Sequence, residues 1–329
     1  MDRPSWKRHA KLAIKTIAAV VVLGAVGWNV RKTWLDLRAR GESVHLDPLW
    51  LAASAGLYLL GLSCCGLFYG LILRKSPSPI PHGAAVRAYL ISHLGKYVPG
   101  KAMVVVMRVA LSTPSGARAA TAAIATFYET LVMMASGSVL AAIGFALSRP
   151  LQRDPLLLSA ALAVAFLVVV DPWVFPRVSR VVMKPLRGMG LGADPHYDRI
   201  LLVMGLLLSG LGWILMGMSQ VAVVHAIRPS GIPISAWPLA TAGVALGTVA
   251  GFVVALLPGG LGVREWVLML TLAPALGQDD AVIAAILLRL TWIAAEAVAG
   301  ALGAVIRPGT VQAGDPEPTQ PPLTGPIEP

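Results

Sequence analysis

Charge and cysteine are scarce in this chain, and each shortage excludes a class of protein. Only 13% of the 329 residues are charged, whereas 56% are hydrophobic and the mean hydropathy is +0.73. This composition lies outside the range of soluble globular proteins. The only cysteines, Cys64 and Cys65, are adjacent in an apolar run and poorly placed to pair, and no Cys/His spacing fits a metal. We therefore expect no disulfide, no metal and no cofactor.

Motifs for nucleotide and nucleic-acid binding are also missing. The glycines at 259–262 resemble a phosphate loop only superficially, because no Lys-Ser/Thr pair follows them. The net charge is +11, but the basic residues gather at the ends of apolar segments rather than on one soluble face. Contact with anionic lipid headgroups and a positive-inside orientation explain this excess. The sequence thus excludes ATP and nucleic acid as partners.

Long apolar runs fill most of the chain instead. Several exceed the roughly 20 residues that a helix needs to cross a bilayer. They predict an all-α polytopic membrane protein with six full spans, near 13–30, 49–73, 119–147, 155–176, 200–227 and 281–306. The first run resembles a signal peptide, but its length and the lack of a small-x-small site favour an uncleaved helix.

Two further apolar segments, about 84–111 and 237–276, are broken by Pro-Gly pairs at Pro99-Gly100 and Pro258-Gly259. Backbone groups freed by a break inside a bilayer must be buried in protein or line a cavity. Matching breaks in two halves of a chain point to a binding site between repeats, as in transporters. The separation of the two glycines, 259 minus 100, is 159 residues, or about half the chain.

The basic loops constrain how the broken segments sit in the membrane. If each segment enters and leaves on the same side as a re-entrant helix pair, the major basic clusters and both termini are cytoplasmic. An inverted repeat then follows, with repeat A at about 49–147 and repeat B at about 200–306, inside a membrane domain of residues 1–308. The alternative is that the pieces cross separately, which gives about eight helices. The Pro-rich tail, 309–329, is predicted to be disordered.

Basic residues bracket the first break. Lys96, Lys101 and Arg108 could hold a lipid phosphate together with the N–H groups freed after Pro99-Gly100. In the alternative reading, the lysines extend to the membrane surface and meet only bulk headgroups. Tyr97 is expected to be an interfacial anchor.

The second break offers a different set of groups. Gly259, Gly260 and Gly262 permit close approach of the backbone. Arg264 and Glu265 follow directly, either as a local ion pair that fixes the helix start or as substrate contacts.

Carboxylates lie deep in the two spans that follow the breaks. Glu129 and Glu296 are each about ten residues into a span, near the middle of the bilayer, where an ionised carboxylate must pair, face water or hold a proton. Arg289, seven residues before Glu296, is a plausible partner for a carboxylate of the bundle. Both a structural pair and a role in substrate or proton coupling remain open for each glutamate.

The stretches Gly95-Lys96-Tyr97-Val98-Pro99-Gly100-Lys101 and Leu257-Pro258-Gly259-Gly260-Leu261-Gly262-Val263-Arg264-Glu265, with Glu129 and Glu296 behind them, resemble the lysylphosphatidylglycerol synthase transmembrane-region family, also described as flippase-like. The resemblance extends to about Arg307 and implies a protein of the plasma (inner) membrane that moves a lipid between leaflets. The aminoacyl-transferase domain of bifunctional relatives does not follow here, so we do not expect lipid aminoacylation.

The favoured hypothesis is a lipid flippase that works without ATP hydrolysis on an anionic or phosphate-bearing lipid, and not an enzyme. Two alternatives remain: a membrane enzyme using glutamates as acid and base on a lipid-linked substrate, or a non-transporting partner of a lipid-modifying enzyme. A homo-oligomer or a complex with a lipid-synthesis enzyme is compatible with either. The candidate substrate-binding residues are Lys96, Tyr97, Pro99, Gly100, Lys101, Arg108, Glu129, Pro258, Gly259, Gly260, Gly262, Arg264, Glu265, Arg289 and Glu296.

Overall fold

The computed structural model describes Trp28 and residues 46–97, 102–148, 153–182, 195–254 and 263–305, and over these residues it contains helices and no strand. The helices, in chain order, are α2 (Pro48–Arg74), α3 (His82–His93), η1 (Leu94–Tyr97), α4 (Ala102–Ser112), η2 (Thr113–Ser115), α5 (Ala119–Leu147), α6 (Arg153–Val170), α7 (Phe175–Val182), α8 (Arg199–Ile227), η4 (Ile234–Ala236), α9 (Trp237–Val253), α10 (Val263–Leu276) and α11 (Gln278–Val305). Six helices in this part of the chain are long and apolar enough to cross a membrane. The predicted class, an all-α polytopic membrane protein, is confirmed.

Most predicted spans match observed helices closely. The spans near 49–73, 119–147, 200–227 and 281–306 correspond to α2, α5, α8 and α11. The span near 155–176 ends earlier than predicted, because α6 stops at Val170 before Pro172 and the short helix α7 follows. The sixth helix of spanning length is Ile234–Val253, within the second broken segment, where half of a re-entrant pair was expected. The predicted span 13–30, apart from Trp28, and the tail 309–329 lie outside the described residues.

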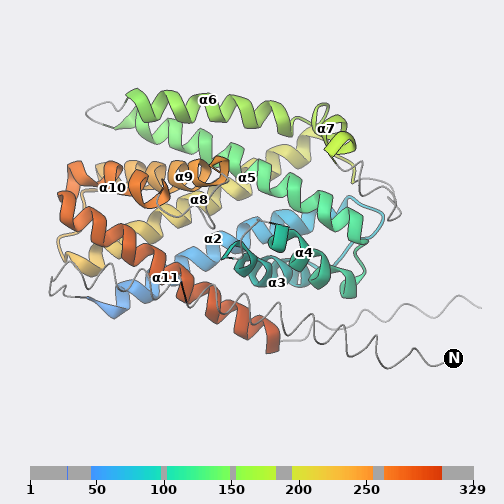
Figure 1. Ribbon diagram of the computed structural model, residues 1–329, viewed down its shortest axis with the longest axis horizontal. Coiled ribbons are helices and arrows are strands. Elements are labelled where there is room, and N and C mark those ends of the chain that lie inside the picture. Colours follow the sequence, from blue (N-terminus) through green and yellow to red (C-terminus); the bar gives the residue numbers. More distant parts are fainter. Residues whose placement is uncertain are drawn as a thin grey trace, which may run out of the picture.

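Two long antiparallel helices, α2 and α8, form the centre of the bundle (Figure 1). At one end the backbone N–H of Asp47 donates to the carbonyl of Ala226, at 3.0 Å. At the other end the N–H of His196 donates to the carbonyl of Lys75, at 3.1 Å, and the Lys75 ammonium pairs with Asp198. We call these two ends the Asp47 end and the Arg74 end.

Glycines let α2 and α8 approach closely. A Cβ added to Gly61 would lie 2.8 Å from the carbonyl oxygen of Gly212, and one added to Gly212 would lie 2.9 Å from that of Gly61. Small residues at such crossings allow backbone contact in membrane proteins, where packing replaces the hydrophobic effect as the driving force.

The first broken segment, α3 to α4, begins and ends at the Arg74 end. His82, at the start of α3, lies 2.9 Å from Arg74 between ring and guanidinium nitrogens. Ser112, at the end of α4, is hydrogen-bonded to Tyr69 on the last turns of α2, with 3.0 Å between the hydroxyl oxygens. The segment therefore turns back inside the bundle rather than crossing it.

The second broken segment, α9 to α10, does the same from the Asp47 end. A Cβ on Gly144, near the end of α5, would lie 2.6 Å from the carbonyl of Pro238 at the start of α9. Helix α10 ends at Leu276, and Gly277 links it to α11, which starts at Gln278. Helix α11 then runs to the Arg74 end, where Arg87 of α3 donates to the carbonyl of Gly303 at 2.6 Å. Figure 1 shows the two broken segments in opposite halves of the bundle.

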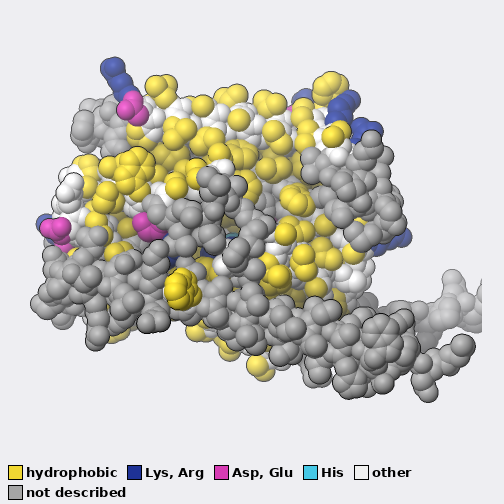
Figure 2. Space-filling model, in the orientation of Figure 1, with side chains coloured by type: hydrophobic (Ala, Val, Ile, Leu, Met, Phe, Trp, Pro, Cys, Tyr) yellow, Lys and Arg dark blue, Asp and Glu magenta, His cyan; other side chains and the backbone are white. Residues whose placement is uncertain are grey.

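Charged side chains separate toward the two ends. Apolar side chains dominate the face in Figure 2, and most coloured charges lie near its two ends. The described basic residues of the Arg74 end are Arg74, Lys75, Arg87, Arg118, Arg177, Arg180 and Arg199. The Asp47 end carries Asp47, Asp154, Asp279 and Asp280 together with Arg153 and Arg228. The molecule thus has one basic end and one mixed, acid-rich end.

The glycine contact predicts a steric cost for a single methyl group. Gly61→Ala should lower the free energy of unfolding by about 1–3 kcal/mol, because the backbones of α2 and α8 must separate. Gly56→Ala on the same helix is the control, since nothing lies within 4 Å of its added Cβ. Thermal unfolding of both purified variants in one detergent measures the difference. Equal melting temperatures would show that the two helices do not pack through Gly61.

Asp198, at the Arg74 end, should make the stability of the fold depend on pH. Its pKa is lowered first by the hydrogen bond from Lys75 and then by the N–H of Leu201, which the carboxylate caps at 2.7 Å. A lowered folded-state pKa stabilises the fold above the unfolded pKa of about 4, and this stabilisation is lost as the pH falls through the folded value. Asp198→Asn, which keeps a cap, should therefore melt below wild type at pH 7 and alongside it near pH 3. Asp198→Ala, which also removes the cap, should lower the free energy of unfolding by about a further 1 kcal/mol at both pH values. Equal stability of the two variants would show that the cap contributes nothing.

Candidate functional site

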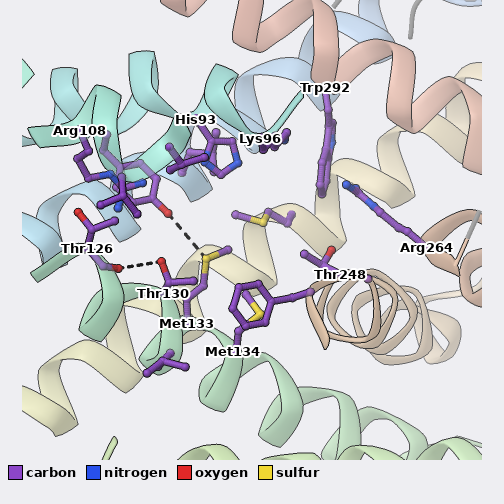
Figure 3. Close-up of a pocket in the computed structure, with 18 of the residues that line it drawn as sticks. His93, Lys96, Arg108, Thr126, Thr130, Met133, Met134, Thr248, Arg264 and Trp292 are labelled. Atoms are coloured by element: carbon purple, nitrogen blue, oxygen red, sulfur yellow. Dashed lines mark hydrogen bonds between the residues drawn. The ribbon is translucent and has the colours of Figure 1, made fainter. Parts of the chain in front are cut away.

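A cavity of about 350 Å³ lies at the middle of the bundle, where the described flanks of both breaks meet. Lys96 and Val104 line it from the two sides of the first break, and Phe252 and Arg264 from the two sides of the second. The remaining lining residues come from α2, α3, α4, α5, α8, α9 and α11. Figure 3 shows Lys96, Arg108 and Arg264 directed toward this space, which methionines and Trp292 also border. The predicted convergence of the two broken segments is thus present in the geometry.

Arg108 and Glu129 form a fully buried ion pair on one side of the cavity. The guanidinium Nη1 lies 2.8 Å from Glu129 Oε2, and both residues are 1% exposed. Arg108 Nε also donates to the hydroxyl of Ser92 at 3.0 Å, and its Cζ lies 4.1 Å from the ring centroid of Tyr89. The Tyr89 hydroxyl in turn donates to Glu129 Oε1 at 3.1 Å. Both oxygens of Glu129 are engaged, so this pair holds α3, α4 and α5 together.

Lys96 and Glu296 form a second cluster that joins the two halves of the chain. The Lys96 ammonium and the Tyr58 hydroxyl both donate to Glu296 Oε1, and His93 Nε2 lies 4.0 Å from the same oxygen. Glu296 is 1% exposed, whereas the Lys96 side chain is 24% exposed. Among the residues that the structure describes, Glu296 Oε2 has no hydrogen-bond partner. This carboxylate is less completely paired than Glu129.

Arg264 reaches the cavity from the first turn of α10. Its guanidinium carbon lies 4.1 Å from the centroid of the Trp292 ring, a cation–π contact, and Figure 3 shows it pointing toward the indole. Trp292 stacks on Tyr58 with ring centroids 3.9 Å apart and donates from Nε1 to Ser219 at 2.9 Å. Within the described part of the chain, Nη2 of Arg264 is buried without a hydrogen-bond partner. A guanidinium that keeps a donor free at a cavity wall can bind an anion.

The structure corrects two expectations and gives the partner of a third residue. Glu265 does not form the local ion pair with Arg264, because Arg289 of α11 pairs with Glu265 instead. Arg289 thus has a carboxylate partner in the bundle, as predicted, and the cation of Glu296 is Lys96. Tyr97 is not an interfacial anchor: it is 5% exposed and packs on Ile293 in the interior, because η1 carries it inside the bundle.

Several predicted residues lie outside the described part of the chain. They are Pro99, Gly100, Lys101, Pro258, Gly259, Gly260 and Gly262, the break residues themselves. Of the predicted residues that are described, Lys96, Arg108 and Arg264 line the cavity.

Sequence reasoning missed the aromatic residues of the site. Tyr58, Tyr89 and Trp292 each use a ring face and a polar group at the cavity. Each lies in the interior of its helix rather than at an end, where membrane aromatics gather. A buried Tyr or Trp needs a partner for its O–H or N–H, so a mid-helix position was the signal that could have found them.

The apolar part of the cavity is not sealed from the outside. Phe127 of α5 lines the cavity and is 40% exposed. Leu131 of α5, Val104 of α4 and Phe252 of α9 line it too and are half-buried. The space therefore combines one buried and two half-buried cations with an apolar wall that continues to the surface of the bundle.

Comparison with known protein families gives a match over most of the chain. Residues 15–300 match the family model described as the lysylphosphatidylglycerol synthase TM region. The chain belongs to this family. It is accordingly a membrane protein of a family related to lipid handling. Comparison with curated proteins gives no match.

The buried pair of Arg108 and Glu129 predicts strong, non-additive destabilisation. Glu129→Gln or Arg108→Met alone should cost about 3–5 kcal/mol, because each leaves one buried charge without its partner. The double variant should cost clearly less than the sum, since it leaves no lone charge. Thermal unfolding in detergent of the four proteins completes the cycle. Additive losses would show that the two charges do not depend on each other.

Proposed function

We propose that this protein is a lipid transporter that moves an anionic or phosphate-bearing lipid between the leaflets of the membrane without ATP hydrolysis. The observation that carries the proposal is the cavity at the meeting point of two broken segments, with one buried and two half-buried cations on a largely apolar wall. A lipid has the same two parts, a charged headgroup and apolar chains. The family, which is related to lipid handling, supports this direction.

Charge balance favours an anionic headgroup. Lys96, Arg108 and Arg264 line the cavity, and the carboxylates in contact with these cations are Glu129 and Glu296. Three positive charges minus two negative charges leave one positive charge without a carboxylate among these residues. This excess of positive charge attracts a negatively charged headgroup to the cavity.

Arg264 is the best candidate for the headgroup contact. A planar guanidinium with a free donor suits a phosphate oxygen, and Trp292 already holds its plane. Arg108, expected from the sequence to bind phosphate, is committed to Glu129 and Ser92 and is assigned a structural role. Met133, Met134 and Met216 provide an adaptable apolar wall for the first carbons of the chains.

The arrangement of the broken segments fits alternating access. We propose that repeat A, about 49–147, and repeat B, about 200–306, are inverted copies whose re-entrant pairs face opposite leaflets. The basic Arg74 end then lies in the cytoplasm by the positive-inside rule, and the membrane is the plasma (inner) membrane. Transport is favoured over enzyme chemistry because Glu129 and Glu296 are each bound to a cation rather than converging on one reacting atom.

Leaflet exchange in proteoliposomes tests the proposal. Wild type should move acyl-labelled phosphatidylglycerol or a short-chain polyprenyl phosphate faster than empty liposomes do. Arg264→Gln should slow that exchange about tenfold or more, since hydrogen bonds to charged groups contribute about 1.5–3 kcal/mol. Arg153→Gln, an exposed arginine at the start of α6, is the matched control and should match wild type. Wild-type rates equal to those of empty liposomes for both anionic probes would reject the proposal.

A further inference from the structure

We infer that Glu296 takes up one proton each time a lipid anion binds Lys96, so that the lipid and the proton cross the membrane together without net charge. This inference rests on the proposed transport function and names its coupling ion. Of the two carboxylates Glu129 and Glu296, Glu296 is the one whose cation can move away.

Glu129 is not the exchanging group. Its Oε2 is bound by Arg108 and its Oε1 by Tyr89. Arg108 is itself 1% exposed, bonded to Ser92 and in contact with the ring of Tyr89. A headgroup could not reach Arg108 without dismantling the packing of α3, α4 and α5.

Glu296 depends on a cation that can move. Lys96 lies on η1, directly before the first break, and its side chain lines the cavity and is 24% exposed. Its ammonium ends a flexible four-carbon stem and can rotate toward a new partner. Within the described residues Oε2 of Glu296 has no hydrogen-bond partner, so loss of Lys96 leaves the carboxylate without a cation and with the neighbouring tyrosine hydroxyls, Tyr58 and Tyr97, as its donors.

The anion that draws Lys96 away enters the cavity that Lys96 and Arg264 both line. The Lys96 ammonium is 5.9 Å from the centroid of Tyr58, Tyr58 stacks on Trp292, and Arg264 contacts that indole, which Figure 3 shows between Lys96 and Arg264. A headgroup anion in the cavity is therefore placed to attract Lys96, the cation that can move, while Arg264 stays held against the indole.

A carboxylate left behind in this interior does not stay ionised. An unpaired buried charge is strongly unfavourable, and such a group neutralises by taking a proton. The groups that face or surround Glu296 are Tyr58 of α2, His93 of α3, Lys96 and Tyr97 of η1 and Arg264 of α10. None of the cations among them replaces Lys96 once it and Arg264 hold the lipid anion. His93, 4.0 Å away, is the neighbouring group that can relay the proton from water.

The exchange balances in charge and in atoms. The lipid contributes one negative charge, and the Glu296 carboxylate gains one proton from the side on which the cavity is open. Lys96 remains an ammonium ion throughout and changes only its partner. On release, Lys96 returns to Glu296 and the proton leaves on the opposite side with the lipid.

The experiment imposes a pH difference on proteoliposomes that contain a labelled lipid monoanion which wild type moves. A one-unit difference should drive the lipid toward the alkaline leaflet, up to a tenfold ratio, because one pH unit is a factor of ten in proton activity. A potassium diffusion potential set with valinomycin should leave that ratio unchanged, because no net charge moves. Glu296→Gln, which resembles the protonated form, should still exchange the lipid but give equal leaflets under the same pH difference.

Two further variants test whether the proton binds Glu296 or a neighbouring group. Asp279→Asn at the start of α11 is the matched control and should keep the wild-type response. His93→Gln should slow the approach to the ratio without abolishing it. If His93→Gln abolishes the response while Glu296→Gln keeps it, the proton site is His93 and the inference is overturned.

The other possible results also test the coupling of lipid to proton. Wild type that exchanges lipid but gives equal leaflets under the pH difference overturns the coupling and leaves the proposed transport intact. A ratio that follows the diffusion potential shows a lipid anion moving alone and also overturns it. Absence of exchange for every anionic lipid overturns both. If Glu296→Gln fails to fold by size-exclusion chromatography, the wild-type responses to pH and potential alone decide.

Discussion

Pairing of charges inside an apolar bundle is the constraint on which this structure depends. Neither water nor lipid can solvate a carboxylate at mid-depth, so Glu129 and Glu296 must each find a cation from another helix. Those cations come from α4 and η1, the two pieces on either side of the first break. Satisfying the carboxylates therefore brings the broken segment into the core and fixes α3, α4, α5 and α11 around one space. Arg264 adds a third cation to the lining of that space, and within the described residues its buried Nη2 has no hydrogen-bond partner.

Each half of the chain pairs a charge on its broken segment with an opposite charge on the long helix that follows, and the signs are reversed between the halves. In the first half the cation is on the returning piece of the broken segment and the acid on the following long helix, Arg108 with Glu129. In the second half the acid is on the returning piece and the cation on the long helix, Glu265 with Arg289. Each pair ties a returning piece to the helix after it. The contact between Lys96 and Glu296 is different, because it crosses from one half to the other and includes a partly exposed, flexible side chain. The pairs Arg108–Glu129 and Arg289–Glu265 thus lie within the halves, and the pair Lys96–Glu296 lies between them.

Much of the fold could be predicted because its signals are local. Helix positions followed from the lengths of apolar runs, and α5 begins and ends at the predicted residues. The breaks at the two Pro-Gly pairs were local as well, since proline removes a donor and glycine relaxes the backbone. The choice of partners was not local. Arg289 was predicted to pair with a carboxylate of the bundle, but the sequence could not say which one; it pairs with Glu265 on α10, because contacts between helices depend on their rotation and depth. Tyr97 was placed at the interface for the same reason: the sequence gives no measure of how deeply η1 enters the bundle.

The sequence by itself determined that the chain is a helical membrane protein with two broken segments and a few charges that are unfavourable inside a bilayer. Each of these features is local: the length of an apolar run, a proline that removes a backbone donor, and a carboxylate in an apolar segment. Tertiary structure alone decided which charges meet, that Arg108 is committed to structure, and that Arg264 keeps a free donor beside Trp292. Those outcomes depend on distances of a few ångströms between helices far apart in the chain. Burial sets the energetic importance of each charge, and packing sets its partner.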